Sequence, residues 1–162
     1  SIGDALAVAT LNKKKISKKD FKQFHPGGNL SIKLKTVEDI MLTKDKVPFI
    51  NENSSMKIAL KILTVKKLGT LIVKNKKGDT TGIITDGQIR RMGQKNKNLH
   101  DLKVKQVMTE NPINVNKNIL AQKALSIMNE KKITSLCVNS SNKKNKTIGI
   151  IHIHNLLEAN IQ

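Results

Sequence analysis

The side chains best suited to chemistry are two arginines and a pair of histidines. Arg90 and Arg91 are adjacent and supply the only guanidinium groups among 30 basic residues, and a guanidinium can bind phosphate or carboxylate through two parallel hydrogen bonds. His152 and His154 lie two residues apart, so on a strand both rings would point to one face. A zinc site needs a third protein ligand, and the neighbouring residues offer none. We therefore expect no metal site.

Thr85 directly precedes a segment that is predicted to be helical, and Asp86 begins it. Threonine and aspartate are common helix caps, and they are equally suited to contact a polar ligand, so both interpretations stay open. The single cysteine, Cys137, lies in an apolar run and is predicted to be a buried small hydrophobic residue rather than a nucleophile.

An internal repeat organises the chain. Residues 37–41 recur as 104–108 and residues 82–85 recur as 149–152, both at an offset of 67, and between them residues 66–73 match 131–138 at an offset of 65. Three matched blocks in the same order indicate a duplication.

Each copy predicts the same order of elements. A short helical start is followed by an extended piece, an amphipathic helix, two strands rich in Ile and Val, and a closing helix. The apolar positions that predict the amphipathic helices are Met56, Ala59, Leu60 and Leu63 in the first copy and Leu120, Ala124, Leu125 and Met128 in the second. Prolines at positions 48 and 112 favour extended backbone in the residues before them, and Ser54 or Ser55 is the candidate N-cap of the first amphipathic helix. In the first copy the predicted extended piece is 47–50, the two strands are 70–73 and 82–85, and the closing helix is 86–92. In the second copy the extended piece is 113–115, the two strands are 135–138 and 149–152, and the closing helix is 154–159.

Length, charge and cysteine content limit the class of protein. A chain of 162 residues can bury a real core, one cysteine cannot form an internal disulfide, and no apolar run is long enough to span a membrane. The net charge of +18 invites a nucleic-acid interpretation. The composition argues against it, because nearly all of that charge is lysine and only 2% of residues are aromatic, whereas such sites favour arginine and stacking platforms.

The duplicated motifs resemble a tandem pair of cystathionine-β-synthase (CBS) domains. The resemblance implies an α+β fold in which two β-α-β-β-α repeats, residues 37–103 and 104–162, pack through their sheets. Such pairs are regulatory modules that bind adenosyl or other nucleotides in clefts between the repeats.

The whole chain also resembles the D-arabinose-5-phosphate isomerase family. The motifs are GDALAVA at residues 3–9, DFxxxHPGGxL at 20–30, VxDIM at 37–41 and GIxTDGxxRR at 82–91. The resemblance implies that residues 1–36 are the tail of an α/β sugar isomerase (SIS) domain, that the parent enzyme is cytoplasmic, and that it interconverts D-arabinose 5-phosphate and D-ribulose 5-phosphate without a catalytic cofactor. In the family the HPGG histidine belongs to the active site, and here it is His25. We expect the chain alone to be inactive, since one histidine lacks its catalytic partners.

Nucleotide-binding CBS repeats commonly end their last strand in a pattern of Gly, two apolar residues, Thr or Ser, two further residues and Asp. Their hydroxyl contacts phosphate and their carboxylate contacts ribose. The first repeat keeps Thr85 but has Gln88 at the acid position, and the second has His152 and Asn155. His152 and His154 look like the isomerase family's own variation. The predicted ligand contacts are Thr85, Asp86, Gln88, Arg90, Arg91, Thr134, Ser135, His152 and His154.

The resemblance also implies partners for the pair. Its regulatory ligand is predicted to be CMP-Kdo, the activated sugar downstream in the pathway, with AMP or ATP as the alternative. The parent is expected to be a homo-oligomer, a tetramer built from dimers of CBS pairs, in which the pair contacts its own SIS domain. An alternative is that the repeats act only as an oligomerisation module and sense no ligand.

Overall fold

A computed structural model describes residues 32–95, 98–140 and 145–162 of the chain. The predicted catalytic residue His25 lies outside these residues, as does most of the segment assigned to the SIS tail.

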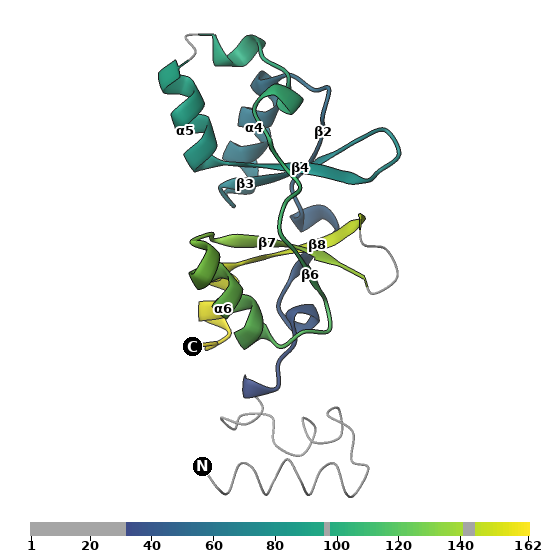
Figure 1. Ribbon diagram of the computed structural model, residues 1–162, viewed down its shortest axis with the longest axis vertical. Helices are drawn as coiled ribbons and strands as arrows, with labels where there is room; N and C mark the ends of the chain where they lie inside the picture. Colours follow the sequence, from purple (N-terminus) through teal and green to yellow (C-terminus); the bar gives the residue numbers. More distant parts are fainter. Residues whose placement is uncertain (1–31, 96–97, 141–144) are drawn as a thin grey trace, which may run out of the picture.

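The two repeats have the same elements in the same order (Figure 1). The β-α-β-β-α order that the sequence predicts is confirmed in each, with both hairpin strands slightly longer than expected. The first repeat contains β2 (Phe49–Asn51), α4 (Met56–Lys66), β3 (Thr70–Lys74), β4 (Thr80–Thr85) and α5 (Asp86–Lys95), and the second contains β6 (Asn114–Asn116), α6 (Ala121–Lys131), β7 (Ser135–Asn139), β8 (Thr147–His152) and α7 (Ile153–Glu158).

Short elements connect the repeats and begin each of them. They are the 3-10 helices η1 (Val37–Asp39), η2 (Lys44–Lys46), η3 (Leu99–Asp101) and η4 (Val104–Gln106), and the two-residue strands β1 (Leu42–Thr43) and β5 (Thr109–Glu110).

Strand pairing is the same in both copies. In the first repeat β2 pairs in parallel with β3, and β3 and β4 form an antiparallel hairpin. In the second repeat β6 pairs in parallel with β7, and β7 and β8 form an antiparallel hairpin. Thr70 faces Thr85 in one hairpin as Ser135 faces His152 in the other, and both hairpins shift register one position before their ends. The matched register fixes which residues of the two repeats are structurally equivalent.

Each repeat gives its leading strand to the other repeat's sheet. β1, at the start of the first repeat, pairs with β8 in a sheet of order β1-β8-β7-β6, and β5, at the start of the second, pairs with β4 in a sheet of order β2-β3-β4-β5. Two residues are too few to give a period-2 signal, which explains why these strands were not predicted.

Glycines in the last strands make room for the exchanged strands. A Cβ on Gly149 of β8 would lie 2.8 Å from the carbonyl oxygen of Leu42, and a Cβ on Gly82 of β4 would lie 2.9 Å from that of Thr109. A glycine inside a strand commonly marks such a close backbone approach. The repeated Gly-Ile-Ile block is therefore a requirement of the exchange.

The exchange also joins the two cores. Val37 is fully buried in the core of the second repeat and Val104 in that of the first. Their backbone amides donate to the carbonyl oxygens of Ile119 and Ser54, each at 2.9 Å. Neither repeat therefore completes its core from its own residues.

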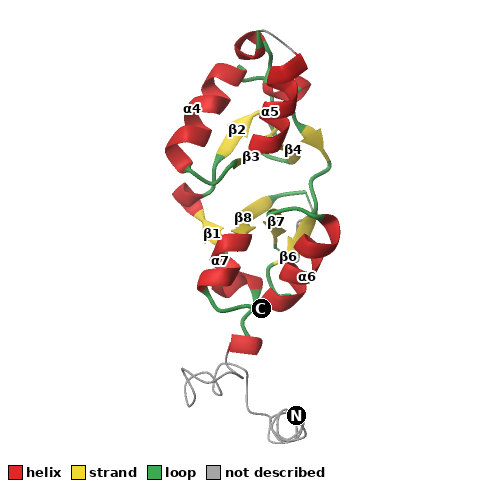
Figure 2. Cartoon of the chain, turned by 90° about the vertical axis from the view of Figure 1, so that its left-hand side faces the viewer, coloured by secondary structure: helices red, strands yellow, loops and turns green. Residues whose placement is uncertain are grey.

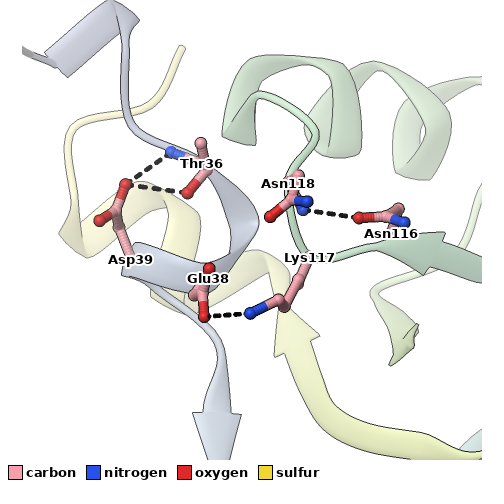
Figure 3. A network of polar contacts seen from close by, with 6 residues as sticks. All are labelled: Thr36, Glu38, Asp39, Asn116, Lys117 and Asn118. Carbon is pink, nitrogen blue, oxygen red and sulfur yellow. Dashed lines mark hydrogen bonds and ion pairs between the residues drawn. The ribbon is translucent and has the colours of Figure 1, made fainter. Parts of the chain in front are cut away.

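Polar contacts hold the first exchanged segment in place (Figure 3). Lys117, which follows β6, forms an ion pair with Glu38 of η1 at 2.6 Å. The carboxylate of Asp39 accepts hydrogen bonds from the amide and the hydroxyl of Thr36 at 2.8 and 3.0 Å. Because both ion-paired side chains are partly exposed, the pair adds little to stability and acts mainly on orientation.

The two sheets face each other at the middle of the molecule, with α4, α5, α6 and α7 on the outer sides (Figures 1 and 2). Ile72, Cys137 and Ile150 are fully buried together in this seam. The Thr70 and Ser135 hydroxyls lie 3.2 Å apart across it, and the Thr80 hydroxyl donates to that of Thr147 at 2.8 Å. Each pair joins equivalent positions of the two repeats.

Cys137 is buried as predicted. Burial is the main cause that raises the pKa of its thiol to about 11, and a hydrogen bond with Thr147 opposes the rise. A thiol in this state is a poor nucleophile near neutral pH.

Replacing Gly149 with alanine is expected to lower the free energy of unfolding by about 1–3 kcal/mol, as overpacked sites do. The added methyl would meet the backbone of β1, which cannot turn aside as a side chain can. Chemical denaturation followed by circular dichroism measures the change.

Gly93→Ala is the matched control, because a Cβ at this position in α5 would meet nothing within 4 Å. It should be neutral or stabilising by up to about 1 kcal/mol, the helix preference of alanine over glycine. Equal stability of Gly149→Ala and the natural chain would contradict the close approach.

Candidate functional site

A cleft of about 610 Å³ opens on the seam and is lined by both repeats. The first repeat and the exchanged segment after it supply one wall, and the start of β7 and the end of β8 supply the other. The lining residues are Leu68, Gly69, Ile83, Thr85, Asp86, Gly87, Gln88, Arg91, Thr109, Asn111, Pro112, Ile113, Lys132, Ile133, Thr134, Ser135, His152 and His154.

Gln88 stabilises the start of α5. Its side-chain carbonyl accepts hydrogen bonds from the amide and the hydroxyl of Thr85 at 2.8 and 3.2 Å, and its amide group donates to the hydroxyl of Thr109. The Thr85 hydroxyl accepts from the Gln88 backbone amide at 3.4 Å. The capping role left open for Thr85 is thus present, and Gln88 also ties α5 to the exchanged strand β5.

Asp86 supplies a carboxylate to this wall of the cleft. The residue is exposed, and its backbone amide donates to the carbonyl of Gly69 at 3.0 Å. A Cβ on Gly69, whose φ is +61°, would lie 2.8 Å from the Asp86 carboxylate. Only glycine both adopts this backbone easily and leaves space for the carboxylate against it.

The two adjacent arginines differ in position. Arg91 lines the cleft, and the Cβ position on Gly87 lies 3.5 Å from its guanidinium and 3.9 Å from the Thr85 hydroxyl. Both side chains are exposed on α5, but Arg90 is not among the lining residues. Consecutive residues of a helix point about 100° apart, so one of them faces the cleft and the other does not.

His152 and His154 form the opposite wall. The backbone amide of His154 donates to Nδ1 of His152 at 3.2 Å, and the two rings lie 4.9 Å apart. The His152 backbone amide donates to the side chain of Asn155 at 3.4 Å. Burial lowers the pKa of His152, and the charge of His154 lowers it further. A neutral His152 with an unprotonated Nδ1 fits this cap.

Lys132, Thr134 and Ser135 lie beside the histidines. Lys132 ends α6 in the left-handed conformation, with φ +53°, and Thr134 is exposed at the cleft. Ser135 is buried and its hydroxyl pairs with that of Thr70. Of these three, Lys132 brings a cation and Thr134 an available hydroxyl.

The cleft therefore unites eight of the nine predicted ligand contacts, all except Arg90. The sequence interpretation missed Lys132 and the segment with Thr109 and Asn111. Lys132 stands in one of the repeated blocks, which could have indicated it, whereas Thr109 reaches the cleft through the unpredicted strand exchange. Within residues 32–95, 98–140 and 145–162, no three His, Cys, Asp or Glu side chains gather as a metal site would require.

Comparison with known proteins identifies the fold family. The CBS-domain family model matches the chain twice, over residues 37–94 and 104–161. The chain belongs to the CBS-domain family. The cleft on the seam is thus the groove between the two repeats of a CBS pair.

Curated relatives agree with the second resemblance. The chain is 38% identical to the arabinose 5-phosphate isomerase KdsD of Salmonella typhi and 37% identical to that of Escherichia coli K12, in each case over 99% of the chain and 48% of the relative. It is 36% identical to the uncharacterized protein RP505 of Rickettsia prowazekii, over 99% of the chain and 49% of that protein. The chain spans about half the length of these relatives.

Solved structures confirm the tandem CBS fold. CBSX2 in complex with AMP has a TM-score of 0.68 and 24% identity, covering 78% of this chain and 96% of that one. The CBS pair of MJ0100 in complex with methylthioadenosine and S-adenosyl-L-methionine has a TM-score of 0.68 and 22% identity, covering 77% and 94%. Among the described residues, every helix is too short or too polar to cross a lipid bilayer.

Acidification is expected to destabilise the folded chain through His152, which lies in the second wall of the cleft. Since the pKa of His152 is lowered in the folded chain, the unfolded chain binds the proton more readily, and the free energy of unfolding falls as pH drops below about 6.5. Above that pH the stabilisation is fully present. Denaturation curves between about pH 5 and 7.5 measure the slope, and a ring NMR titration measures the pKa.

His152→Gln should flatten that pH dependence, whereas His100→Gln, in η3 and outside the cleft, should leave it. His154→Gln should move the pKa of His152 upward, because it removes the neighbouring charge. An NMR titration placing the His152 pKa above the ordinary histidine value would refute the assignment.

Proposed function

We propose that the chain is the regulatory CBS pair of an arabinose 5-phosphate isomerase and that it senses a nucleotide in the seam cleft. The observation that carries the proposal is the meeting of Thr85, Asp86 and Arg91 with His152 and His154 in one cavity. A ligand held there would touch both repeats, so its binding would favour one relative position of the two.

The parent activity rests on the relatives. In the proposed parent, residues 37–103 and 104–162 are the CBS repeats, residues 1–36 are the tail of the SIS domain, and His25 belongs to the active site. An aldose–ketose isomerase moves a proton between neighbouring carbons and needs acid and base groups for it. The chain alone, which offers one histidine of that site, is proposed to be inactive.

The proposed ligand is CMP-Kdo. It combines a phosphate and a carboxylate with a nucleoside, and a cleft with Arg91 and Lys132 suits anionic groups. The solved CBS pairs with AMP and with methylthioadenosine and S-adenosyl-L-methionine support nucleosides as the ligand class and keep AMP or ATP as the alternative.

A thermal-shift panel of CMP-Kdo, CMP, AMP, ADP and ATP tests the sensing role. A ligand present at about 100 times its Kd adds about 2.7 kcal/mol, which for a domain of this size raises Tm by about 5–10 °C. CMP-Kdo is expected to give the largest rise. If no member of the panel raises Tm at millimolar concentration, nucleotide sensing is wrong.

Matched variants place the effect in the cleft. Thr85→Ala should reduce the ligand-induced rise in Tm, whereas Thr64→Ala should not, because the Thr64 hydroxyl is bonded to the Leu60 carbonyl on α4, outside the cleft. The rise is compared with each variant's own ligand-free Tm, since Thr85 also caps α5.

Assembly is the second candidate function. Ile58 and Val65 on α4 and Leu157 on α7 are 51%, 67% and 51% exposed, and apolar side chains on outer helices favour contacts between copies. Light scattering on the same samples separates the two roles. Oligomers that form equally with and without nucleotide, together with an unchanged Tm, would favour assembly.

A further inference from the structure

The two repeats place equivalent side chains around the seam, and a difference between them decides where an anion can bind. Gln88 accepts a hydrogen bond from the Thr85 amide just as Asn155 accepts one from the His152 amide. The two closing helices are therefore aligned residue for residue.

Under this alignment, the position of Arg91 in α5 is held by Glu158 in α7. Arg91 lines the cleft near Thr85. Glu158 is exposed at the last position of its helix and is not among the cleft residues. The first repeat thus presents a cation where the second presents a carboxylate, and a carboxylate repels the negative charge of a phosphate group.

The lysines that end α4 and α6 carry the same charge but differ in their position relative to the cleft. Lys67 and Lys132 are equivalent, and both are left-handed, with φ +54° and +53°. Lys132 lines the cleft and Lys67 does not. The cleft therefore receives Arg91 from the first repeat and Lys132 from the second, on opposite walls.

The exchanged strands add a third difference. Thr109 of β5 contributes a hydroxyl to the cleft, held by Gln88. Its equivalent in β1, Leu42, packs against the apolar cluster of the seam. The cleft thus holds a hydroxyl and two cations beside the Asp86 carboxylate. The equivalent positions carry one apolar side chain, one carboxylate and a single cation, at Leu42, Glu158 and Lys67.

We propose that each chain binds one anionic ligand, with its phosphate group held between Arg91 and Lys132, and that the equivalent position beside Glu158 takes no second ligand. The proposal deepens the nucleotide-sensing function and rests on it. A phosphate in this place links the two repeats through charge-assisted hydrogen bonds, which are the strong ones.

Calorimetric titration of the chain with AMP, CMP, CMP-Kdo and inorganic pyrophosphate tests the assignment. The expected stoichiometry is one ligand per chain. Arg91→Gln should weaken the affinity about 10- to 100-fold, the usual effect of removing a hydrogen bond to a charged group. Arg90→Gln, which changes the adjacent arginine outside the cleft, should stay within about twofold, in line with a screened surface charge.

Lys132→Gln and Lys67→Gln form a second matched pair with the same backbone conformation. The first is expected to weaken binding about tenfold and the second to leave it nearly unchanged. Circular dichroism of each variant confirms folding, so that a loss of affinity reports the site and not the fold.

The outcomes separate this proposal from the general one. Two ligands per chain, or equal affinities for Arg91→Gln and Arg90→Gln, would overturn the anion assignment while nucleotide sensing stands. Pyrophosphate binding that depends on Arg91 without binding of any nucleotide would support the anion site and refute the nucleotide. Binding of none of the four would remove both.

Discussion

The exchange of the leading strands is the constraint on which the rest of the structure depends. Val37 and Val104 are buried in the core of the opposite repeat, and β1 and β5 complete the opposite sheet. A unit of about 60 residues is only marginally stable alone, and here it would also expose a strand edge and a gap in its core. The pair must therefore fold as one body, which fixes the seam and the cleft on it.

A symmetric scaffold with unequal side chains explains how one pair can offer a single distinct site. The backbone repeats closely, down to the left-handed Lys67 and Lys132 and the register shifts in both hairpins. The chemistry does not repeat, because Thr85 of the first hairpin is replaced by His152 at the equivalent position of the second, and Arg91 corresponds to Glu158. Substitutions at exposed positions of this kind change the potential around the cleft and leave the exchanged core intact.

Much of this organisation could be predicted from the sequence. The repeated Gly-Ile-Ile block marked the last strands, and helical spacing marked Met56, Ala59, Leu60 and Leu63, of which all but the half-buried Leu60 are buried in α4. Leu120, predicted on the apolar face of α6, is instead its N-cap and is 37% exposed. The strand exchange could not be predicted, since β1 and β5 are two residues long and pair with residues far away in sequence. For the same reason Thr109 was missed, whereas Arg90 was included because sequence alone does not show which way α5 faces.

Gln88 and Asn155 carry amide side chains at the position where nucleotide-binding CBS repeats commonly have an aspartate, and this restricts what the cleft can recognise. A carboxylate at Gln88 or Asn155 would be available for sugar hydroxyls, but both amides are engaged in capping their own helices, and Gln88 also donates to Thr109. Because the Gln88 side-chain oxygen already accepts from two protein donors, it is a weak additional acceptor, and under the proposed function a sugar diol would be bound by another group. Asp86 is the carboxylate on the same wall of the cleft as Gln88, and its side chain lies close to Gly69. Under the proposed function, the carboxylate available to a ligand is therefore Asp86, the first residue after β4, and not the third residue, where Gln88 stands.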